Sequence, residues 1–303
     1  MQPVIQTYGL CKMYKKAEVL HDFNITIERG HICGLIGPNG AGKTTIIKKL
    51  AGLIAQSRGD MIFFGNGENL NESRRRMSFM IESPMILLGM TARENLMYIR
   101  YLRGYPDEKR IDEVLELVGL ADTGSKKASK FSLGMKQRLG IGMALLTHPE
   151  VLVLDEPVNG LDPEGIVDVR RILQRLSSEE KVTILISSHI LSELAELCTD
   201  FSIISNGCLI ENLSRDELHD RCKSHITLCS DDDKKTAFVL ENTLDIHSYK
   251  VMKDGEIHIF ERLDDVRGIS QTLTQNGLVI SKLCEEGTSL EEYYLEKVGE
   301  QHG

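Results

Sequence analysis

A glycine-rich segment between an apolar run and a helical run is the strongest constraint on how this chain can fold. The apolar run covers residues 32–36 and the helical run begins at Ile46. The segment between them holds Gly37, Pro38, Asn39, Gly40, Ala41, Gly42, Lys43, Thr44 and Thr45. Glycines let the backbone curl so that successive N–H groups face an anion at a helix start, where the helix dipole also favours negative charge. The segment therefore predicts a phosphate-binding loop for a nucleoside triphosphate.

Two side chains of this loop have predicted roles of their own. The Lys43 ammonium is expected to reach the β- and γ-phosphates, and the Thr44 hydroxyl is expected to ligate Mg²⁺. A glycine turn that matches the pattern by accident is the alternative, and the strand-to-helix setting argues against it. A phosphate loop alone does not indicate which class of nucleotide hydrolase contains it.

Length and charge set broad limits on the rest of the chain. With 303 residues, of which 41% are hydrophobic, the chain is long enough for two domains. Its net charge of −9, without a polybasic block, leads us to expect no nucleic-acid partner. The sequence starts without a cationic leader and an apolar segment behind it, and no stretch reaches about 18 uninterrupted apolar residues. We therefore expect a cytoplasmic protein that does not span the membrane.

The cysteines are scattered along the sequence. There are seven of them, and none belongs to a C-x-x-C pair. An odd, scattered set of this kind predicts neither a disulfide framework nor a zinc site. We expect reduced, mostly buried, structural thiols.

Short β-branched runs alternate with helical runs from about residue 4 to residue 212. The predicted strands cover 4–7, 23–27, 32–36, 61–64, 78–81, 151–154, 183–187 and 201–205. This alternation is typical of an α/β fold with a largely parallel sheet. Between about 83 and 150, apolar residues recur instead at helical spacing, in 91–103, 107–118 and 133–146. We predict a nucleotide-binding α/β domain over 1–212 with an all-helical insert at about 83–150.

Residues 213–303 are predicted to form a small, separate α+β unit. Strand-like runs at 226–229, 249–252 and 256–260 are interleaved with helical runs at 214–221, 234–241 and 263–276. Asp231, Asp232 and Asp233 resemble a metal cluster, but the lysines that follow favour a helix N-cap and a solvated turn. No internal repeat is visible in the sequence, so we expect one nucleotide-binding core.

Polar side chains end two of the predicted strands. Asp155 and Glu156 follow the apolar run 151–154, so they are expected at the carboxyl edge of the sheet beside the phosphate loop. There Asp155 can hold Mg²⁺ through its coordinated water, and Glu156 can polarise the attacking water. Adjacent acids also suit a helix N-cap, and the upstream phosphate loop favours the catalytic role. His189 follows the run 183–188 and is predicted to contact the γ-phosphate, with a structural histidine as the alternative.

A further segment, 131–138, opens a helix. Ser132 can cap this helix, and Gly134 allows a phosphate to approach the backbone closely. The features that now follow one another along residues 4–212 are the phosphate loop, residues 131–138, Asp155 with Glu156, residues 159–162, and His189. This ordered set resembles the ATP-binding subunit of an ABC transporter, which implies a P-loop NTPase of ABC type.

The resemblance implies that catalysis belongs to a dimer. Two subunits of this family face each other head to tail and enclose two ATP molecules, each held by the phosphate loop of one subunit and the signature segment of the other. The implied roles are phosphate and Mg²⁺ binding for Lys43 and Thr44, the second Mg²⁺ position for Asp155, the general base for Glu156, a γ-phosphate sensor for His189, communication across the dimer for Asp162, and adenine stacking for Tyr14. A core tyrosine is the alternative for Tyr14.

The signature segment departs from the family pattern. The family usually has Leu-Ser-Gly-Gly-Gln, whereas this chain has Phe131, Ser132, Leu133, Gly134 and Met135. It keeps the serine and one glycine but loses the other glycine and the glutamine. Ser132 and Gly134 therefore remain available to a phosphate held by the facing subunit.

Glu82 is the second departure, because the family normally places a glutamine there. A carboxylate can ligate Mg²⁺ or orient water, but it adds negative charge near the triphosphate and cannot donate a hydrogen bond while ionised. A surface acid unrelated to the nucleotide is the alternative. Glu82 within 81–84, together with the closing run 289–295, resembles the bacitracin and lantibiotic self-protection branch of ABC transporters. That branch implies export of a peptide antibiotic.

The resemblance also implies a membrane partner. The family docks a helix of the membrane subunit near the start of the helical insert. Candidate groove residues are Met85, Ile86, Leu87, Leu88, Met90 and Tyr98, most of which we expect in the local core. The permease is expected to be a separate polypeptide and the second ATP-binding subunit a copy of this chain, held at the inner face of the membrane. The alternatives are a non-transport ATPase of the same superfamily and an ATP sensor that binds without hydrolysing.

Overall fold

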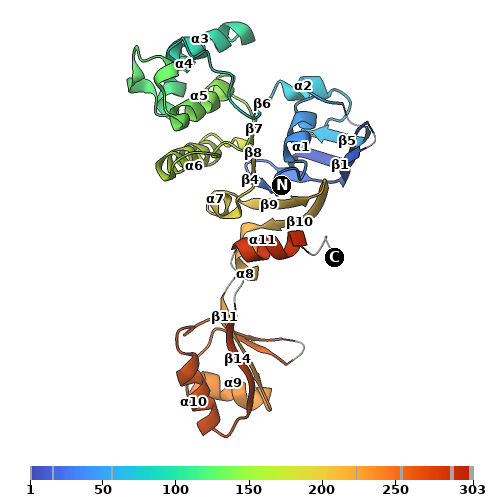
Figure 1. The fold of residues 1–303 in the computed structure, drawn as a ribbon, viewed down its shortest axis with the longest axis vertical. Helices are drawn as coiled ribbons and strands as arrows, with labels where there is room; N and C mark the ends of the chain where they lie inside the picture. Colours follow the sequence, from blue (N-terminus) through green and yellow to red (C-terminus); the bar gives the residue numbers. More distant parts are fainter. Residues whose placement is uncertain are drawn as a thin grey trace. The chain divides into compact units, whose positions relative to one another are not determined.

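The computed structural model describes residues 2–15, 17–55, 57–222, 224–252, 255–286 and 290–299 (Figure 1). This part of the chain divides into two compact units. We call the first the nucleotide unit; it contains the described residues up to Arg215 together with those from Lys297. The second, which we call the C-terminal unit, contains Asp216–Glu296. The phosphate loop and the other motifs of the ATP-binding pattern lie in the nucleotide unit.

A mostly parallel sheet forms the centre of the nucleotide unit. Its strands, in spatial order, are β10 (Cys208–Ser214), β9 (Asp200–Ser205), β4 (Ile32–Ile36), β8 (Thr183–Ser188), β7 (Val151–Asp155) and β6 (Met77–Met80). Neighbouring strands are parallel except β10, which pairs antiparallel with β9. The predicted α/β fold with a largely parallel sheet is confirmed.

Helices cover this sheet. Figure 1 shows α1 (Lys43–Leu50) on one side of it, and α6 (Pro163–Ser178) and α7 (Leu191–Ala195) on the other. Every residue of β4, β7 and β8 is buried. Strands covered on both faces have no exposed side, which explains why their sequences are nearly continuous apolar runs.

A second, antiparallel sheet lies around a long first strand. β1 (Pro3–Tyr14) pairs with β2 (Ala17–Phe23), β3 (Thr26–Glu28) and β5 (Arg58–Phe63), and α2 (Leu70–Arg74) follows β5. The predicted single strand over 23–27 is wrong. The Thr7 hydroxyl donates to the Phe23 carbonyl oxygen and accepts from the Ile25 N–H, both at 3.0 Å. A side chain thus satisfies the backbone groups that a continuous strand would have paired.

The predicted helices appear between β6 and β7. They are α3 (Ala92–Arg103), α4 (Lys109–Leu117) and α5 (Leu133–Leu145), with short 3₁₀ turns at η1 (Ala121–Thr123) and η2 (Ala128–Lys130). Thr91 and Glu94 form a reciprocal capping box at the start of α3, and Gly104 ends that helix in the left-handed conformation. These local signals place the helix ends where the sequence indicated.

The C-terminal unit is an α+β fold, as predicted. Its elements are α8 (Arg215–Arg221, whose first residue belongs to the nucleotide unit), β11 (His225–Ser230), α9 (Asp233–Asn242), β12 (Tyr249–Val251), β13 (Ile257–Ile259), α10 (Val266–Gln275), β14 (Ile280–Glu286) and α11 (Leu290–Gly299, whose residues from Lys297 belong to the nucleotide unit). The sheet has the antiparallel order β12-β13-β11-β14, which is a split β-α-β-β-α-β arrangement. Apolar residues of α9 and α10 share one core with those of β11 and β13.

Two sequence expectations about this end of the chain have different outcomes, and one strand was not expected. Asp232 caps α9 by accepting a hydrogen bond from the Lys235 N–H at 3.0 Å, so the predicted N-cap is confirmed. β14 was not predicted, because Lys282 and Glu285 interrupt its apolar residues. Ser289 of the closing run 289–295 lies outside the described residues, and α11 begins at Leu290.

The cysteines are less buried than expected. Cys11, Cys33 and Cys198 are buried, whereas Cys208, Cys222, Cys229 and Cys284 are half-buried. Burial raises the pKa of the Cys33 thiol to about 12, so this thiol is held in its unreactive, protonated form. Over the described ranges, no helix is both long and apolar enough to cross a membrane.

Lys49 is a buried cation in the first helix of the nucleotide unit. Its side chain is fully buried, and its ammonium has no hydrogen-bond partner among the described residues. Burial, reinforced by the nearby Lys12, lowers the pKa of Lys49 to about 8. Below that pH the lysine stays charged inside the folded protein, so its burial costs free energy of folding.

We predict that Lys49→Met stabilises the nucleotide unit at pH 7. The folded pKa lies below the ordinary value of 10.5, so the cost of burying the charge is present at neutral pH and disappears as the pH rises past both values. Thermal unfolding should show a higher Tm for the variant, by about 2–4 °C for each kcal/mol gained, and this gain should shrink towards pH 10. Lys109→Met, at an exposed lysine of α4, is the control. A Tm lowered by Lys49→Met at pH 7 would contradict the prediction.

Candidate nucleotide-hydrolysis site

The phosphate loop fills the turn from β4 to α1, and its glycines meet strict steric limits. Gly42, the N-cap of α1, has a φ of 106°, which side chains rarely tolerate. A Cβ atom on Gly37 would lie 2.4 Å from the Ile204 carbonyl oxygen of β9. The backbone therefore needs glycine at these points in order to curl against the sheet and open its N–H groups at the start of α1.

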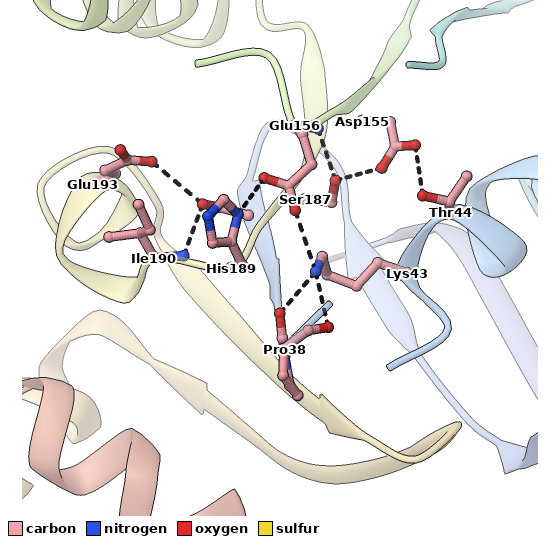
Figure 2. A network of polar contacts seen from close by, with 11 residues as sticks. Pro38, Lys43, Thr44, Asp155, Glu156, Ser187, His189, Ile190 and Glu193 are labelled. Atoms are coloured by element: carbon pink, nitrogen blue, oxygen red, sulfur yellow. Dashed lines mark hydrogen bonds and ion pairs between the residues drawn. The ribbon is translucent and has the colours of Figure 1, made fainter. Parts of the chain in front are cut away.

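The Lys43 ammonium lies against this loop (Figure 2). Its Nζ donates to the carbonyl oxygens of Gly37 at 2.7 Å and Pro38 at 3.2 Å, and it lies 3.2 Å from Oε1 of Glu156. The side chain is only 6% exposed. A buried ammonium held largely by neutral carbonyl oxygens is available to phosphate oxygens, because ionised acceptors bind it more strongly.

Asp155 and Ser187 face each other at the carboxyl ends of β7 and β8. The parallel pairing of these strands sets the two residues directly side by side. The Ser187 hydroxyl donates to Oδ1 of Asp155 at 2.7 Å, and the Thr44 hydroxyl donates to Oδ2 at 2.8 Å. Asp155 is 2% exposed. Both oxygens of this buried carboxylate are therefore fixed, one by the sheet and one by the helix of the phosphate loop.

Glu156 joins the phosphate loop to His189. One carboxylate oxygen contacts Lys43, and the other lies 2.9 Å from Nδ1 of His189 (Figure 2). Glu156 has a φ of 49°, a left-handed conformation that costs a non-glycine residue roughly 1–3 kcal/mol. Its N–H donates to the Ser187 hydroxyl at 2.9 Å, which helps to hold this conformation. The carboxylate is thus aimed from a strained strand end at the groups around the phosphate loop.

Behind His189, a second acid closes the network. Ser188 donates to Glu193 at 3.4 Å and accepts from the Ile190 N–H at 3.0 Å (Figure 2). Burial raises the pKa of Glu193, while the nearby His189 acts in the opposite direction. The start of α7 is thereby tied to the strand end that carries the histidine.

An open pocket of about 570 Å³ lies beside these residues. Its walls include Thr44, Asp155, Glu156, Glu82 and Asn159. Hydroxyl and carboxylate oxygens are the ligands that Mg²⁺ prefers. Thr44 and Asp155 already place two such oxygens 2.8 Å apart, so the residues present fit a magnesium ion at this point.

Glu82 lines the same pocket, but its carboxylate is paired with Lys48. It follows β6 and has a φ of 58°. Its Oε1 accepts a hydrogen bond from Nζ of Lys48 at 2.7 Å. This hydrogen bond raises the pKa of Lys48. The structure therefore places Glu82 and Lys48 together at the edge of the site. The sequence analysis had assigned no role to Lys48.

The signature segment and the loop around Asp162 are built as helix starts. Ser132 caps α5 by accepting from the Met135 N–H at 3.2 Å, as predicted, and Asp162 caps α6 by accepting from the Gly165 N–H at 2.9 Å. A Cβ atom on Gly134 would lie 3.7 Å from the Gly165 Cα, which is an ordinary contact distance. Neither capping side chain is hydrogen-bonded to residues 37–45 within the described part of the chain.

Tyr14 ends β1 and is 45% exposed, so it is not a core tyrosine. The Lys12 ammonium lies 4.8 Å from its ring centroid. Two further residues of the site were not assigned a role from the sequence. Ser187 was considered only as part of the run 183–188. Lys48 was given no role because a lysine in a helix ordinarily faces solvent. Spacing from Thr44, one helical turn earlier, is the signal that could have found Lys48.

Comparison with known proteins places this geometry in a family. A family model described as ABC transporter matches residues 20–159. The bacitracin transport ATP-binding protein BcrA of Bacillus licheniformis is 41% identical over 301 residues, which are 99% of this chain and 98% of that protein. This chain belongs to the ABC transporter ATP-binding proteins. Members of this family hydrolyse ATP to power transport, so the chain is an ATPase.

Further comparisons agree with this ABC ATPase assignment. The lantibiotic transport ATP-binding protein SrtF of Streptococcus pyogenes is 41% identical over 207 residues, covering 68% of this chain and 89% of that protein. A solved structure of the ATP-binding subunit of an ABC transporter has a TM-score of 0.63 at 30% identity, over 72% of this chain and 92% of its own. The predicted P-loop fold of ABC type is confirmed.

We predict that Ser187→Ala weakens Mg²⁺-dependent ATP hydrolysis. The substitution removes the donor to Asp155 and the acceptor for the Glu156 N–H, and loss of an outer-shell partner costs about 10–100-fold in metal affinity or activity. Steady-state hydrolysis measured over a magnesium titration should show a higher half-saturating concentration. Ser205→Ala is the matched control, because the Ser205 hydroxyl is buried without a hydrogen-bond partner in the described residues. Equal magnesium curves for the two variants would contradict the prediction.

Proposed function

We propose that this chain powers a separate membrane permease that exports a peptide antibiotic, with Glu156 as the general base of ATP hydrolysis. The observation that carries the catalytic part is the contact of Glu156 with both Lys43 and His189, at 3.2 and 2.9 Å. Because Lys43 belongs to the phosphate loop, this contact ties the candidate base to the place where phosphate binds. A carboxylate at this position can accept a proton from the attacking water.

The other site residues have supporting roles in this proposal. The N–H groups at the start of α1 bind the phosphates, and Lys43 pairs with phosphate oxygens in place of its carbonyl partners. His189 keeps Glu156 in position and contacts the terminal phosphate. Thr44 and Asp155, with Glu82 beside them, hold Mg²⁺, which neutralises charge on the phosphate oxygens when bound. Tyr14 presents its exposed ring to the adenine.

We further propose that two copies of the chain form the complete site. Ser132 and Leu133 are exposed at the start of α5, and Asp162 is exposed at the start of α6. A helix N-terminus whose exposed serine hydroxyl can still donate a hydrogen bond suits a phosphate held by a facing subunit. Ser132 and Gly134 of one copy would then complete the phosphate loop of the other, with Asp162 at the contact.

The names of two relatives and one residue of this chain support a proposal about the cargo. Two relatives that match this chain are named for bacitracin and lantibiotic transport, and Glu82 replaces the glutamine that is usual in the wider family. These two features together support a peptide antibiotic as the cargo. The chain would act at the inner face of the membrane, held there by the permease.

A groove in the nucleotide unit is the surface that we propose for binding of the permease. It has a volume of about 550 Å³ and is lined by residues of the central sheet and of the helical segment. Met85 is 90% exposed at its edge, and Leu53 and Leu102 are each 66% exposed. Exposed apolar side chains around a groove are typical of a protein-binding surface.

The expectation that most of the six candidate groove residues belong to the local core is wrong. Met85, Leu87, Leu88 and Tyr98 are exposed, and Ile86 and Met90 are half-buried. Met85 lies on the groove, whereas Ile86 and Leu88 line the pocket beside Asp155. The segment follows β6, and its exposed apolar side chains are available to a partner. We propose that a helix of the permease occupies this groove.

We predict that Leu102→Glu in the groove releases the permease. The chain is tagged in its host in the Glu156→Gln form, membranes are solubilised in mild detergent with ATP, and co-purifying proteins are identified by mass spectrometry. Polytopic membrane proteins should co-purify. Leu102→Glu should reduce their recovery about tenfold or more, as expected for a contact residue that becomes buried in the complex. Val279→Glu is the control, because Val279 is 67% exposed in the C-terminal unit.

Two results would contradict this proposal. Recovery of soluble proteins or nucleic acid without any polytopic membrane protein would remove the permease from the function. Equal recovery of the permease with Leu102→Glu and Val279→Glu would keep the permease but exclude this groove as its docking site. Cargo is tested separately, by the sensitivity of the host to bacitracin and to lantibiotics after deletion of the gene.

A further inference from the structure

Glu82 occupies an unusual place for a carboxylate. It lies two residues beyond β6 in a left-handed conformation, with a φ of 58°, which is strained for a residue with a side chain. Its side chain is 66% exposed and lines the pocket that also contains Thr44 and Asp155. A strained conformation of this kind persists only where the surrounding structure holds the residue in place. Contacts of the Glu82 side chain are therefore expected to hold it.

Lys48 provides the main contact of this carboxylate. Its Nζ donates to Oε1 of Glu82 at 2.7 Å. Lys48 follows Thr44 by one turn on α1, so both side chains lie on the same face of the helix. The same helix face therefore presents a hydroxyl to Asp155 and an ammonium to Glu82.

The energetics of this ion pair point to a role other than stability. Its partners are 34% and 66% exposed, and exposed pairs contribute about 0–1 kcal/mol to folding. The charges matter more for the ligand. A lone carboxylate beside a polyphosphate repels it, whereas a carboxylate paired with an ammonium adds no net charge to the pocket.

We propose that Lys48 is a positioning residue. Its positive charge offsets the negative charge of Glu82 and its hydrogen bond orients that side chain, so that a carboxylate can lie in the pocket beside magnesium and triphosphate. Lys48 acts through Glu82 and does not bind the nucleotide itself. The proposal rests on the proposed function, since it requires the pocket beside Thr44 and Asp155 to hold Mg²⁺ and ATP. It predicts that the need for Lys48 disappears once Glu82 is replaced by an uncharged amide of the same shape.

A double-mutant cycle on the full chain tests this dependence. The dissociation constant of a fluorescent, non-hydrolysable ATP analogue is measured with Mg²⁺ for the wild type, Lys48→Met, Glu82→Gln and the double variant. Lys48→Met should raise the dissociation constant about three- to tenfold when Glu82 is present, and should leave it unchanged in the Glu82→Gln background. Lys48→Arg should bind like the wild type, because it keeps the charge.

Lys127→Met is the matched control, because Lys127 pairs with Glu94 at 3.0 Å on the helical segment with similar exposure. It should leave the dissociation constant unchanged. An equal loss from Lys48→Met in both backgrounds would overturn the proposal, since Lys48 would then act on the nucleotide directly. Unchanged binding by Lys48→Met would overturn it as well, and in both cases the ATPase function would stand. A wild type that binds no analogue would overturn both proposals.

Discussion

The parallel pairing of β4, β7 and β8 is the constraint on which the site depends. Strands that run in the same direction end at the same edge of the sheet, so the phosphate loop after β4, the acids after β7 and the histidine after β8 arrive together. The register sets Asp155 beside Ser187. Each strand is fully buried, and a shift of register would expose apolar residues to water or bury the polar strand ends. Burial of the sheet therefore fixes the positions of the polar groups at its edge.

At this edge the polar side chains are arranged in linked pairs. Lys43 contacts Glu156, Glu156 contacts His189, and Thr44 contacts Asp155. Lys48 pairs with Glu82, which lines the pocket. A site prepared in this way needs little rearrangement when a polyanion enters, because its donors and acceptors are already oriented. The chain as a whole has a net charge of −9, so attraction for the nucleotide comes from these local cations and backbone N–H groups.

Much of this arrangement could be predicted from sequence, because its signals are local. The phosphate loop, the helix caps at Ser132 and Asp232, and the apolar runs of the parallel strands each follow from a few neighbouring residues. Features that depend on distant contacts could not. The break between β2 and β3 depends on the Thr7 hydroxyl, which lies 16 and 18 residues from its partners. Likewise, the contact between Lys48 and Glu82 joins residues 34 positions apart, and neither local sequence predicts it.

Catalysis by Glu156 is tested by phosphate release from the full chain, with the wild type compared with Glu156→Gln at saturating ATP and Mg²⁺. The amide keeps the shape of the side chain but accepts no proton from water, so the variant should bind ATP with undiminished affinity while its turnover falls about 10²–10⁴-fold. Glu164→Gln, at an exposed acid in the first turn of α6, should turn over like the wild type. Equal turnover by the wild type and Glu156→Gln would contradict the assignment of Glu156 as the base.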